Sequence, residues 1–168
     1  NCDWSSDVCS SDLTWVKEPG EPTTDDVAAS AAVLADVEAD AVVAIGGGSA
    51  MDTAKAARLV HGSGIPYADW AAGKATYAES PVLFITIPTT SGTGSEVSGG
   101  IVVTDSETHL KKGIAHPTIR AKYALVDPEL THGLPAAPTM YAGIDAIAQA
   151  IAAVAVKARS PIGNGIAF

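Results

Sequence analysis

Three consecutive glycines and a serine, Gly46–Ser49, follow a short apolar run and precede a helical segment that carries Asp52 and Lys55. Glycines here allow a tight turn and a close approach of the backbone to a ligand. The first N–H groups of the following helix have no intrahelical acceptor, and together with the helix dipole they form an anion site suited to phosphate or pyrophosphate. A glycine turn that serves packing alone is the alternative. The spacing matches neither the Walker A loop nor the G-x-G-x-x-G fingerprint.

A second segment, TTSGTGSE at 89–96, is rich in hydroxyls and glycine and directly follows another apolar run. We call Gly46–Ser49 the glycine turn and 89–96 the hydroxyl-rich loop. Ligands of α/β sheets bind beyond the carboxyl ends of the strands, so two such loops at one edge could cradle an extended phosphorylated ligand. By itself the hydroxyl-rich loop is typical of a plain turn, and the pairing of the two loops carries the prediction.

Asp145 is the only charged residue between Thr139 and Val156, a stretch that is otherwise mostly apolar. An ionised carboxylate in such surroundings is costly unless it is paired, hydrogen-bonded or bound to a metal. Gln149 lies four residues further on and therefore on the same helix face. A carboxylate and an amide in this arrangement could share a cation, although glutamine is a poor ligand. The alternative is an aspartate that is hydrogen-bonded near a helix start.

The elements that must position these residues follow from hydrophobic periodicity and capping signals. The segment Thr23-Thr24-Asp25-Asp26 offers N-cap oxygens and early negative charge for a helix whose apolar residues continue to Val37. Apolar runs predict strands buried on both faces at 41–45, 82–87 and 123–126. The remaining predictions are a helix over 49–60, a loop over 65–80, a hairpin that begins with a strand at 101–104, and a helix over 139–156. This order predicts an α/β domain that is followed by a helical part.

Composition limits the class of protein. The chain has 168 residues, of which 47% are hydrophobic, and this excludes a disordered polyelectrolyte. A net charge of -9 argues against nucleic-acid binding. No apolar stretch reaches the roughly 18 residues that are needed to cross a membrane. We expect neither nucleic acid nor membrane as a partner.

The two ends of the chain differ from the rest. The first 13 residues, NCDWSSDVCSSDL, hold both cysteines and have no helix or strand period. They resemble a translated sequencing adapter, so we interpret 1–13 as an artefact, with a natural flexible terminus as the alternative. The remaining chain has no cysteine, which favours a cytoplasmic protein. The segment 157–168 breaks off where a further helix would begin, so we expect a fragment at both ends.

Three stretches carry a resemblance to a known family: AVVAIGGGSAMDTAKAA (41–57), FITIPTTSGTGSEVS (84–98) and ALVDPELTHGLPAAPTMYAGIDAIAQAI (124–151). In order and spacing they resemble the iron-containing (group III) alcohol dehydrogenases. The resemblance implies an incomplete Rossmann-like dinucleotide-binding domain at 14–135, followed at 136–168 by the start of a helical metal-binding domain. It also implies hydride transfer between a small alcohol or aldehyde and NAD or NADP, a divalent metal such as Fe2+ or Zn2+, and a parent protein that could be a homo-oligomer.

The same resemblance assigns roles to individual residues. The pyrophosphate would be held by Gly46, Gly47, Gly48 and Ser49, and the cofactor would be lined by Thr89, Thr90 and Thr93 and contacted by Lys111. Asp145 matches the first metal ligand of the family. Gln149 stands where the family usually has a metal-binding histidine, and Ala152 stands where it often has an acidic residue, so the metal use of the parent protein could be altered.

No catalytic residue is assigned within this chain, and we expect the fragment alone to be inactive because further metal ligands would lie beyond Phe168. Its four histidines are interpreted as surface or loop residues: His61, His109, His116 and His132. Two alternatives stay open. One is a dehydroquinate-synthase-like or glycerol-dehydrogenase-like enzyme. The other is a non-catalytic nucleotide-binding module, for which Gln149 is the best argument.

Overall fold

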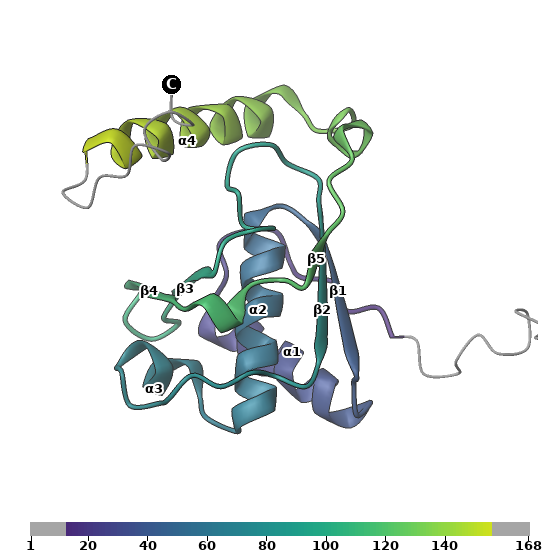
Figure 1. Ribbon diagram of the computed structural model, residues 1–168, viewed down its shortest axis with the longest axis vertical. Helices are drawn as coiled ribbons and strands as arrows, with labels where there is room; N and C mark the ends of the chain where they lie inside the picture. Colours follow the sequence, from purple (N-terminus) through teal and green to yellow (C-terminus); the bar gives the residue numbers. More distant parts are fainter. Residues whose placement is uncertain (1–12, 156–168) are drawn as a thin grey trace, which may run out of the picture.

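A parallel sheet forms the frame of the domain in the computed structural model, which describes residues 13–155. The strands β1 (Ala41–Gly46), β2 (Leu83–Pro88) and the short β5 (Tyr123–Ala124) lie in the order β1-β2-β5, and both pairings are parallel. Gly46 pairs with Pro88, so β1 and β2 end at the same edge. The glycine turn and the hydroxyl-rich loop therefore begin side by side, and the predicted α/β class is confirmed (Figure 1).

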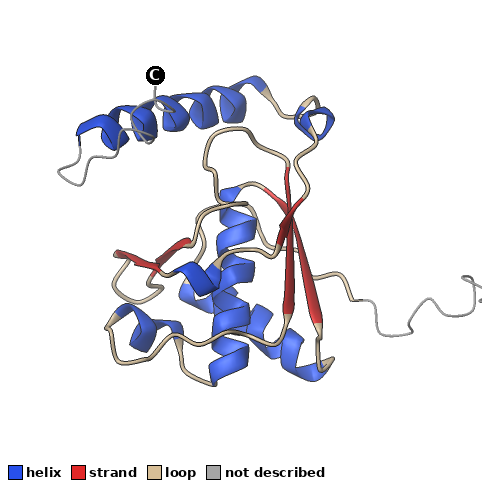
Figure 2. Cartoon of the chain, in the orientation of Figure 1, coloured by secondary structure: helices blue, strands red, loops and turns tan. Residues whose placement is uncertain are grey.

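The helices α1 (Thr24–Asp36) and α2 (Gly48–Ser63) lie on one side of this sheet (Figure 2). Ala44, Met51 and Phe84 form a core between α2 and the sheet. On its other side α2 packs against the antiparallel hairpin of β3 (Gly100–Thr104) and β4 (Lys111–Ala115). There a second core joins the helices to the hairpin through Val27, Ala56, Tyr67, Ile101, Val103 and Ile119. The helix α2 is thus buried from two directions.

The start of α1 follows its capping signal. Thr23 accepts a hydrogen bond from the backbone of Asp26, and the Asp26 carboxylate accepts one from the Thr23 backbone, which is a reciprocal capping box. The turn between β3 and β4 adds to this cap, because the hydroxyls of Thr24 and Ser106 lie 3.0 Å apart. The hairpin predicted from 101–104 onward is confirmed, and it anchors α1.

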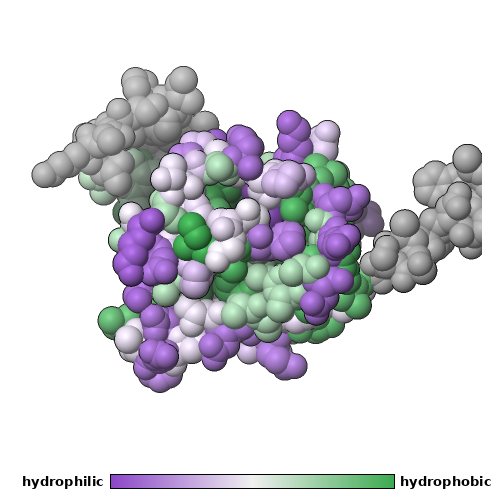
Figure 3. All heavy atoms as spheres, turned by 90° about the horizontal axis from the view of Figure 1, so that it is seen from below, coloured by the Kyte–Doolittle hydropathy of each residue, from purple (hydrophilic) through white to green (hydrophobic). Residues whose placement is uncertain are grey.

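The prediction of strands buried on both faces is wrong for β1. Ala44 is buried, but Val43 is 53% and Ile45 is 62% exposed. In the described residues the helices cover one face of the sheet, so side chains that alternate along β1 meet helix on one side and solvent on the other. Apolar residues are visible among the polar ones when the molecule is seen from below (Figure 3).

Two further predictions are corrected. The strand expected at 123–126 contains two residues, and Leu125 and Val126 are exposed beyond it. The loop expected at 65–80 contains a short helix, α3 (Tyr67–Ala71), which begins after Pro66. Tyr67 and Trp70, three residues apart, are both buried, and their burial stabilises this single turn.

The last described helix, α4 (Ala136–Ala155), crosses above the carboxyl ends of the strands (Figure 1). The 3-10 turn η2 (Pro128–Thr131) lies between β5 and this helix, and another, η1 (Pro117–Ile119), lies between β4 and β5. The helix begins two residues before Pro138, which is tolerated because the first helical turn needs no N–H donor from that residue. Among the described residues, no helix has the length and apolar character that crossing a membrane requires. The interpretations made for 1–12 and 157–168 lie outside the described residues.

Candidate functional site

The glycine turn joins β1 to α2 through a backbone that requires glycine at its first position. Gly46 has a φ of +147°, which L side chains rarely adopt, and an added Cβ would lie 2.9 Å from Cβ of Ala50. The carbonyl of Gly46 accepts a hydrogen bond from the Thr89 amide at 2.9 Å. The turn is therefore bonded directly to the first residue of the hydroxyl-rich loop.

The next two glycines let the hydroxyl-rich loop approach the start of α2. An added Cβ at Gly47 would lie 3.1 Å from Cγ2 of Thr90, and at Gly48 it would lie 2.8 Å from Cγ2 of Thr93. Thr90 and Thr93 therefore pack closely on these glycines, and a Cβ at Gly48 would collide with Thr93 unless one of them shifted. The structure brings together the sequence-predicted residues of both loops, which is the geometry that the sequence pairing implied.

Several polar groups at this junction have no hydrogen-bond partner among the described residues. Gly47 is the N-cap of α2 and supplies no side-chain cap, and Met51 is the first residue whose amide bonds back to the turn. In the described part of the chain, the amides of Gly48, Ser49 and Ala50 have no acceptor. The buried hydroxyl of Thr90 also has no hydrogen-bond partner among the described residues. Unpaired buried polar groups are rare, so this cluster fits an anionic ligand that accepts from them.

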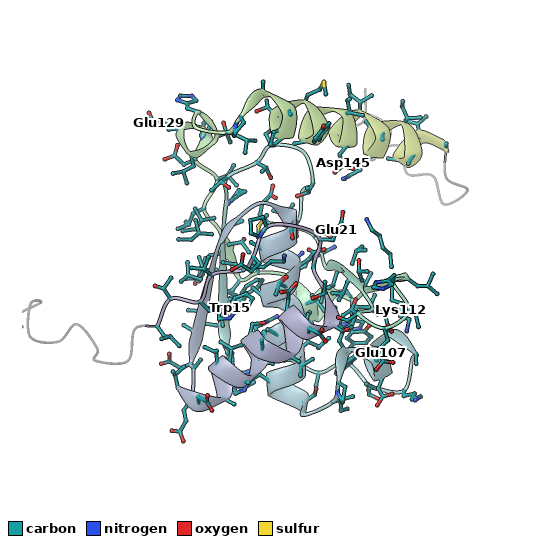
Figure 4. The ribbon with its side chains drawn as sticks, turned by 180° about the vertical axis from the view of Figure 1, so that it is seen from behind. Trp15, Glu21, Glu107, Lys112, Glu129 and Asp145 are labelled. Atoms are coloured by element: carbon teal, nitrogen blue, oxygen red, sulfur yellow. The ribbon has the colours of Figure 1, made fainter. Side chains whose placement is uncertain are left out.

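The Ser49 side chain contacts the segment that precedes α1. Its hydroxyl donates to the carbonyl of Gly20 at 2.5 Å, so the segment before α1 lies beside the glycine turn. Its backbone amide stays available at the helix start. Figure 4 places Glu21, the next residue along the chain, below α4. The segment before α1 thus forms one wall of the junction.

A buried ion pair fixes α2 beneath the two loops. The Lys55 side chain is fully buried, and its ammonium donates to Ser95 Oγ at 2.8 Å and to the Gly100 carbonyl at 2.9 Å. Asp52 lies 3.3 Å from the ammonium, accepts from the Ser95 hydroxyl at 2.5 Å and accepts from the Val102 amide at 3.0 Å. Burial lowers the pKa of Lys55 below its ordinary value of 10.5, while Asp52 acts in the opposite direction.

Sequence reasoning singled out Asp52 and Lys55 but gave them no role, and it did not connect them with Ser95. The signal was a lysine and an aspartate three residues apart on a helix that is otherwise apolar on that face. Their partner Ser95 is 40 residues from Lys55 in sequence, so local spacing could not reveal it. These three side chains tie together α2, the hydroxyl-rich loop and β3.

Lys111 lies apart from the two loops, at the first position of β4. Its ammonium forms a 3.0 Å ion pair with Glu21, and the two side chains are 59% and 63% exposed. Lys111 is therefore linked to the junction indirectly, because Glu21 follows Gly20, the residue that Ser49 contacts. An exposed pair of this kind holds the lysine only weakly and leaves it free to change partner.

Asp145 and Gln149 lie on the face of α4 that is turned toward the hydroxyl-rich loop. Figure 4 shows Asp145 on the side of the helix that faces the domain. The Gln149 amide nitrogen donates to Asp145 Oδ2 at 2.9 Å and to the Thr93 carbonyl at 3.4 Å. Within 13–155, no group of three or more His, Cys, Asp or Glu side chains is arranged to hold a metal ion. The described residues thus provide one carboxylate that would suit a cation, with an amide N–H bonded to it.

The four histidines contribute to structure or surface. His116 caps η1 and stacks on Tyr77 with ring centroids 4.3 Å apart, His61 is half-buried on α2, and His109 and His132 are exposed. A groove of about 580 Å³ lies elsewhere, between α1, α3 and the β3–β4 turn, and it is lined in part by Ala28, Ala31, Ala32 and Ala35. None of the residues of the two loops line this groove.

Comparison with known proteins identifies the family to which this geometry belongs. The profile described as iron-containing alcohol dehydrogenase matches residues 9–128, which include both loops and the buried ion pair. The chain belongs to the iron-containing alcohol dehydrogenase family. The resemblance carried by the three sequence stretches is confirmed.

Two curated relatives and one solved structure illustrate the membership. The chain is 37% identical over 155 residues to the probable alcohol dehydrogenase EutG of Escherichia coli (strain K12), covering 92% of this chain and 39% of the relative. It is 40% identical over 130 residues to the NAD-dependent methanol dehydrogenase of Bacillus methanolicus, covering 77% of this chain and 34% of that protein. The chain spans about two fifths of the length of the first of these iron-containing alcohol dehydrogenases.

The solved structure is that of sulfoacetaldehyde reductase from Bifidobacterium kashiwanohense, a complex with NAD+. It superposes with a TM-score of 0.86 at 33% identity, covering 93% of this chain and 42% of that chain. The fold described above is therefore that of the corresponding part of an iron-containing alcohol dehydrogenase.

Proposed function

We propose that this chain is the cofactor-binding part of an NAD- or NADP-dependent alcohol dehydrogenase or aldehyde reductase. The observation that carries the proposal is the junction of the glycine turn with the hydroxyl-rich loop, where the amides of Gly48, Ser49 and Ala50 lie beside the unpartnered hydroxyl of Thr90. Family membership and the NAD+ complex of a related structure support it.

The proposed binding mode follows from charge and hydrogen bonding. The open amides and the positive end of the α2 dipole attract the cofactor pyrophosphate, which accepts hydrogen bonds from Gly48, Ser49 and Ala50. Gly46 keeps the turn tight so that these donors converge. Thr89, Thr90 and Thr93 line the cofactor on the opposite side, and the buried ion pair beneath holds both walls at a fixed separation.

Lys111 completes the proposed cofactor contact. Its ion pair with Glu21 is exposed and is worth little, so an anionic cofactor can compete for the ammonium. The lysine then supplies a positive charge to the open side of the junction, while the backbone amides act from below.

Asp145 is the residue of this chain that we propose as a metal ligand in the complete protein. Its Oδ1 accepts no hydrogen bond from the described residues, and carboxylate oxygen is a suitable ligand for Fe2+ or Zn2+. Such a metal, when bound, polarises the carbonyl or stabilises the alkoxide of the substrate. The residues of this chain at the sheet edge orient the cofactor for hydride transfer.

The wider setting is proposed by analogy with the family. The substrate is a small alcohol or aldehyde, the protein is cytoplasmic, and the complete protein is a homo-oligomer. The chain alone is inactive in this proposal, because a single carboxylate cannot form a metal site.

Binding of NADH to the purified chain tests the proposal, with Lys111→Met as the variant. We expect saturable binding that is weakened about threefold to tenfold in K111M, since one charge-assisted contact is lost. Lys74→Met is the matched control, because Lys74 also forms an exposed ion pair, with Asp69 at 2.8 Å, and it lies outside the junction. Absence of NADH and NADPH binding to the unaltered chain, measured by calorimetry, would reject the proposal.

A second candidate function is a non-catalytic nucleotide-binding module, which the hydrogen-bonded Gln149 favours. The two functions share the cofactor junction and differ in metal use. In the complete reading frame, Gln149→His should raise metal content and turnover if the parent is a weakened enzyme. A protein that binds NADH but remains inactive with the histidine restored would instead be a binding module.

A further inference from the structure

The helix α4 contacts the hydroxyl-rich loop along one face. Ala142, Asp145 and Gln149 share this face because they are spaced by three and four residues. At Ala142 the contact is tight, since a Cβ added at Gly92 would collide with the Ala142 carbonyl oxygen. At Gln149 the contact is polar, through the 3.4 Å hydrogen bond to the Thr93 carbonyl. Ala142 is the one buried residue of the described helix.

Gln149 uses the same amide nitrogen for both of its hydrogen bonds. One N–H donates to Asp145 Oδ2 at 2.9 Å and the other reaches the Thr93 carbonyl. A side-chain amide has two N–H donors on its nitrogen and acceptor lone pairs on its oxygen alone. A cation shared between Asp145 and Gln149 would need that oxygen turned toward the carboxylate, which would break both hydrogen bonds. The arrangement therefore fits a donor and does not fit a metal ligand.

We propose that Gln149 is a positioning residue: one amide hydrogen bond, to the Thr93 carbonyl, docks α4 on the hydroxyl-rich loop, and the other orients the Asp145 carboxylate, without ligation of a metal. Where the family usually places a metal-binding histidine, this chain has a hydrogen-bond bridge. This inference rests on the proposed function only where it assigns Asp145 the role of a metal ligand. The geometry of the bridge requires neither cofactor nor metal.

Three substitutions at position 149 separate a bridge from a ligand. Gln149→Leu removes both donors. Gln149→Lys keeps donors for Asp145 and the Thr93 carbonyl, but its ammonium has no lone pair for a metal. Gln149→His provides a ligand four residues from Asp145. The matched control is Ala148→Leu, which changes the exposed neighbouring residue of the same helix.

Hydrogen exchange of 89–96 and the nuclear Overhauser contact between Gly92 and Ala142 report docking, each measured with EDTA and with Zn2+. We expect the unaltered chain, Q149K and A148L to dock equally in both solutions. Exchange in Q149L should be about threefold to tenfold faster, as expected for one or two lost hydrogen bonds. Q149H should dock fully only with Zn2+.

The proposal is overturned if docking of the unaltered chain requires Zn2+, if Q149K behaves like Q149L, or if Q149L docks normally. None of these readouts depends on NADH, so they are separable from failure of the proposed function.

Discussion

The helices α2 and α4 meet the same loop in opposite ways. The middle of α2 is enclosed between the sheet and the hairpin, and it holds a lysine, Lys55, that is fully buried. The longer α4 has one buried residue, and its remaining surface carries exposed apolar side chains that include Met140, Tyr141, Ile144, Ile147 and Ile151.

This contrast separates two kinds of site residue. The residues around α2 are fixed by packing and by a satisfied polar network, so they can orient a ligand without further support. Asp145 and Gln149 are held by one close backbone contact and two hydrogen bonds. In this chain the proposed cofactor half of the site is therefore preorganised, whereas α4, the half proposed to face a substrate, is held by few contacts.

Removing the buried ammonium of Lys55 should have the largest effect on stability. Lys55→Met leaves the Asp52 carboxylate without its ion partner and the Gly100 carbonyl without a donor. We expect the free energy of unfolding to fall by about 3 kcal/mol, as for other broken buried pairs. Urea denaturation measures it. Lys74→Met, at an exposed ion pair, should change it by less than about 1 kcal/mol. Equal effects of the two substitutions would contradict the assigned role of the network.

Adding a methyl group between the glycine turn and the hydroxyl-rich loop should have the next largest effect on the free energy of unfolding. In Gly48→Ala the new methyl would meet Thr93 Cγ2, which lies 2.8 Å from the ideal Cβ position. We expect a loss of about 1–2 kcal/mol, as for other overpacked positions, and weaker NADH binding. Thr93→Ser removes that methyl and should relieve part of the loss in the double variant. Gly133→Ala, where nothing lies within 4 Å, is the control.

Blocking the approach of α4 should leave the domain itself nearly unchanged. Gly92→Ala places a methyl against the Ala142 carbonyl, so we expect the Gly92–Ala142 contact to be lost. The free energy of unfolding should change by less than about 1 kcal/mol, because α4 contributes little to the cores. Gly143→Ala, on the same helix with open space around it, should retain the contact. Global unfolding of G92A would show that α4 is an integral part of the domain.

The pH dependence of the free energy of unfolding should show the smallest effect, and it concerns Lys55 on α2. Burial lowers the pKa of Lys55, so the folded chain releases this proton at lower pH than the unfolded chain does. Its contribution to stability is complete above pH 10.5 and is lost as pH falls through the lowered pKa. Between neutral pH and pH 10.5 the unfolding free energy of the unaltered chain should therefore rise relative to K55M. Parallel curves in urea titrations would contradict the lowered pKa.

Much of the junction between the glycine turn and the hydroxyl-rich loop could be predicted from sequence because its signals are local. The glycine turn, the hydroxyl-rich loop and α2 each follow from composition and periodicity over a few residues. Their meeting at one edge follows from the rule that parallel strands present their carboxyl ends together. The two pairings of Gly46, with the strand residue Pro88 and the Thr89 amide, confirm that inference.

The parts that could not be predicted depend on long-range neighbours. An apolar strand such as β1 has the capacity for burial on both faces, but burial of Val43 and Ile45 depends on what covers them. Ser95, which accepts a hydrogen bond from Lys55, is 40 residues away in sequence. The bridge made by Gln149 could not be predicted, because the spacing of residues along a helix does not show where the Thr93 carbonyl lies.

We propose that the glycine turn and the hydroxyl-rich loop bind the cofactor together. Titration of the isotopically labelled chain with NADH, followed through backbone amide resonances, tests it most directly. We predict saturable shifts at 46–50 and 89–93, and their loss in Gly48→Ala at the same NADH concentrations. Saturable shifts confined to the groove between α1 and α3, or no saturable shifts at all, would contradict the claim.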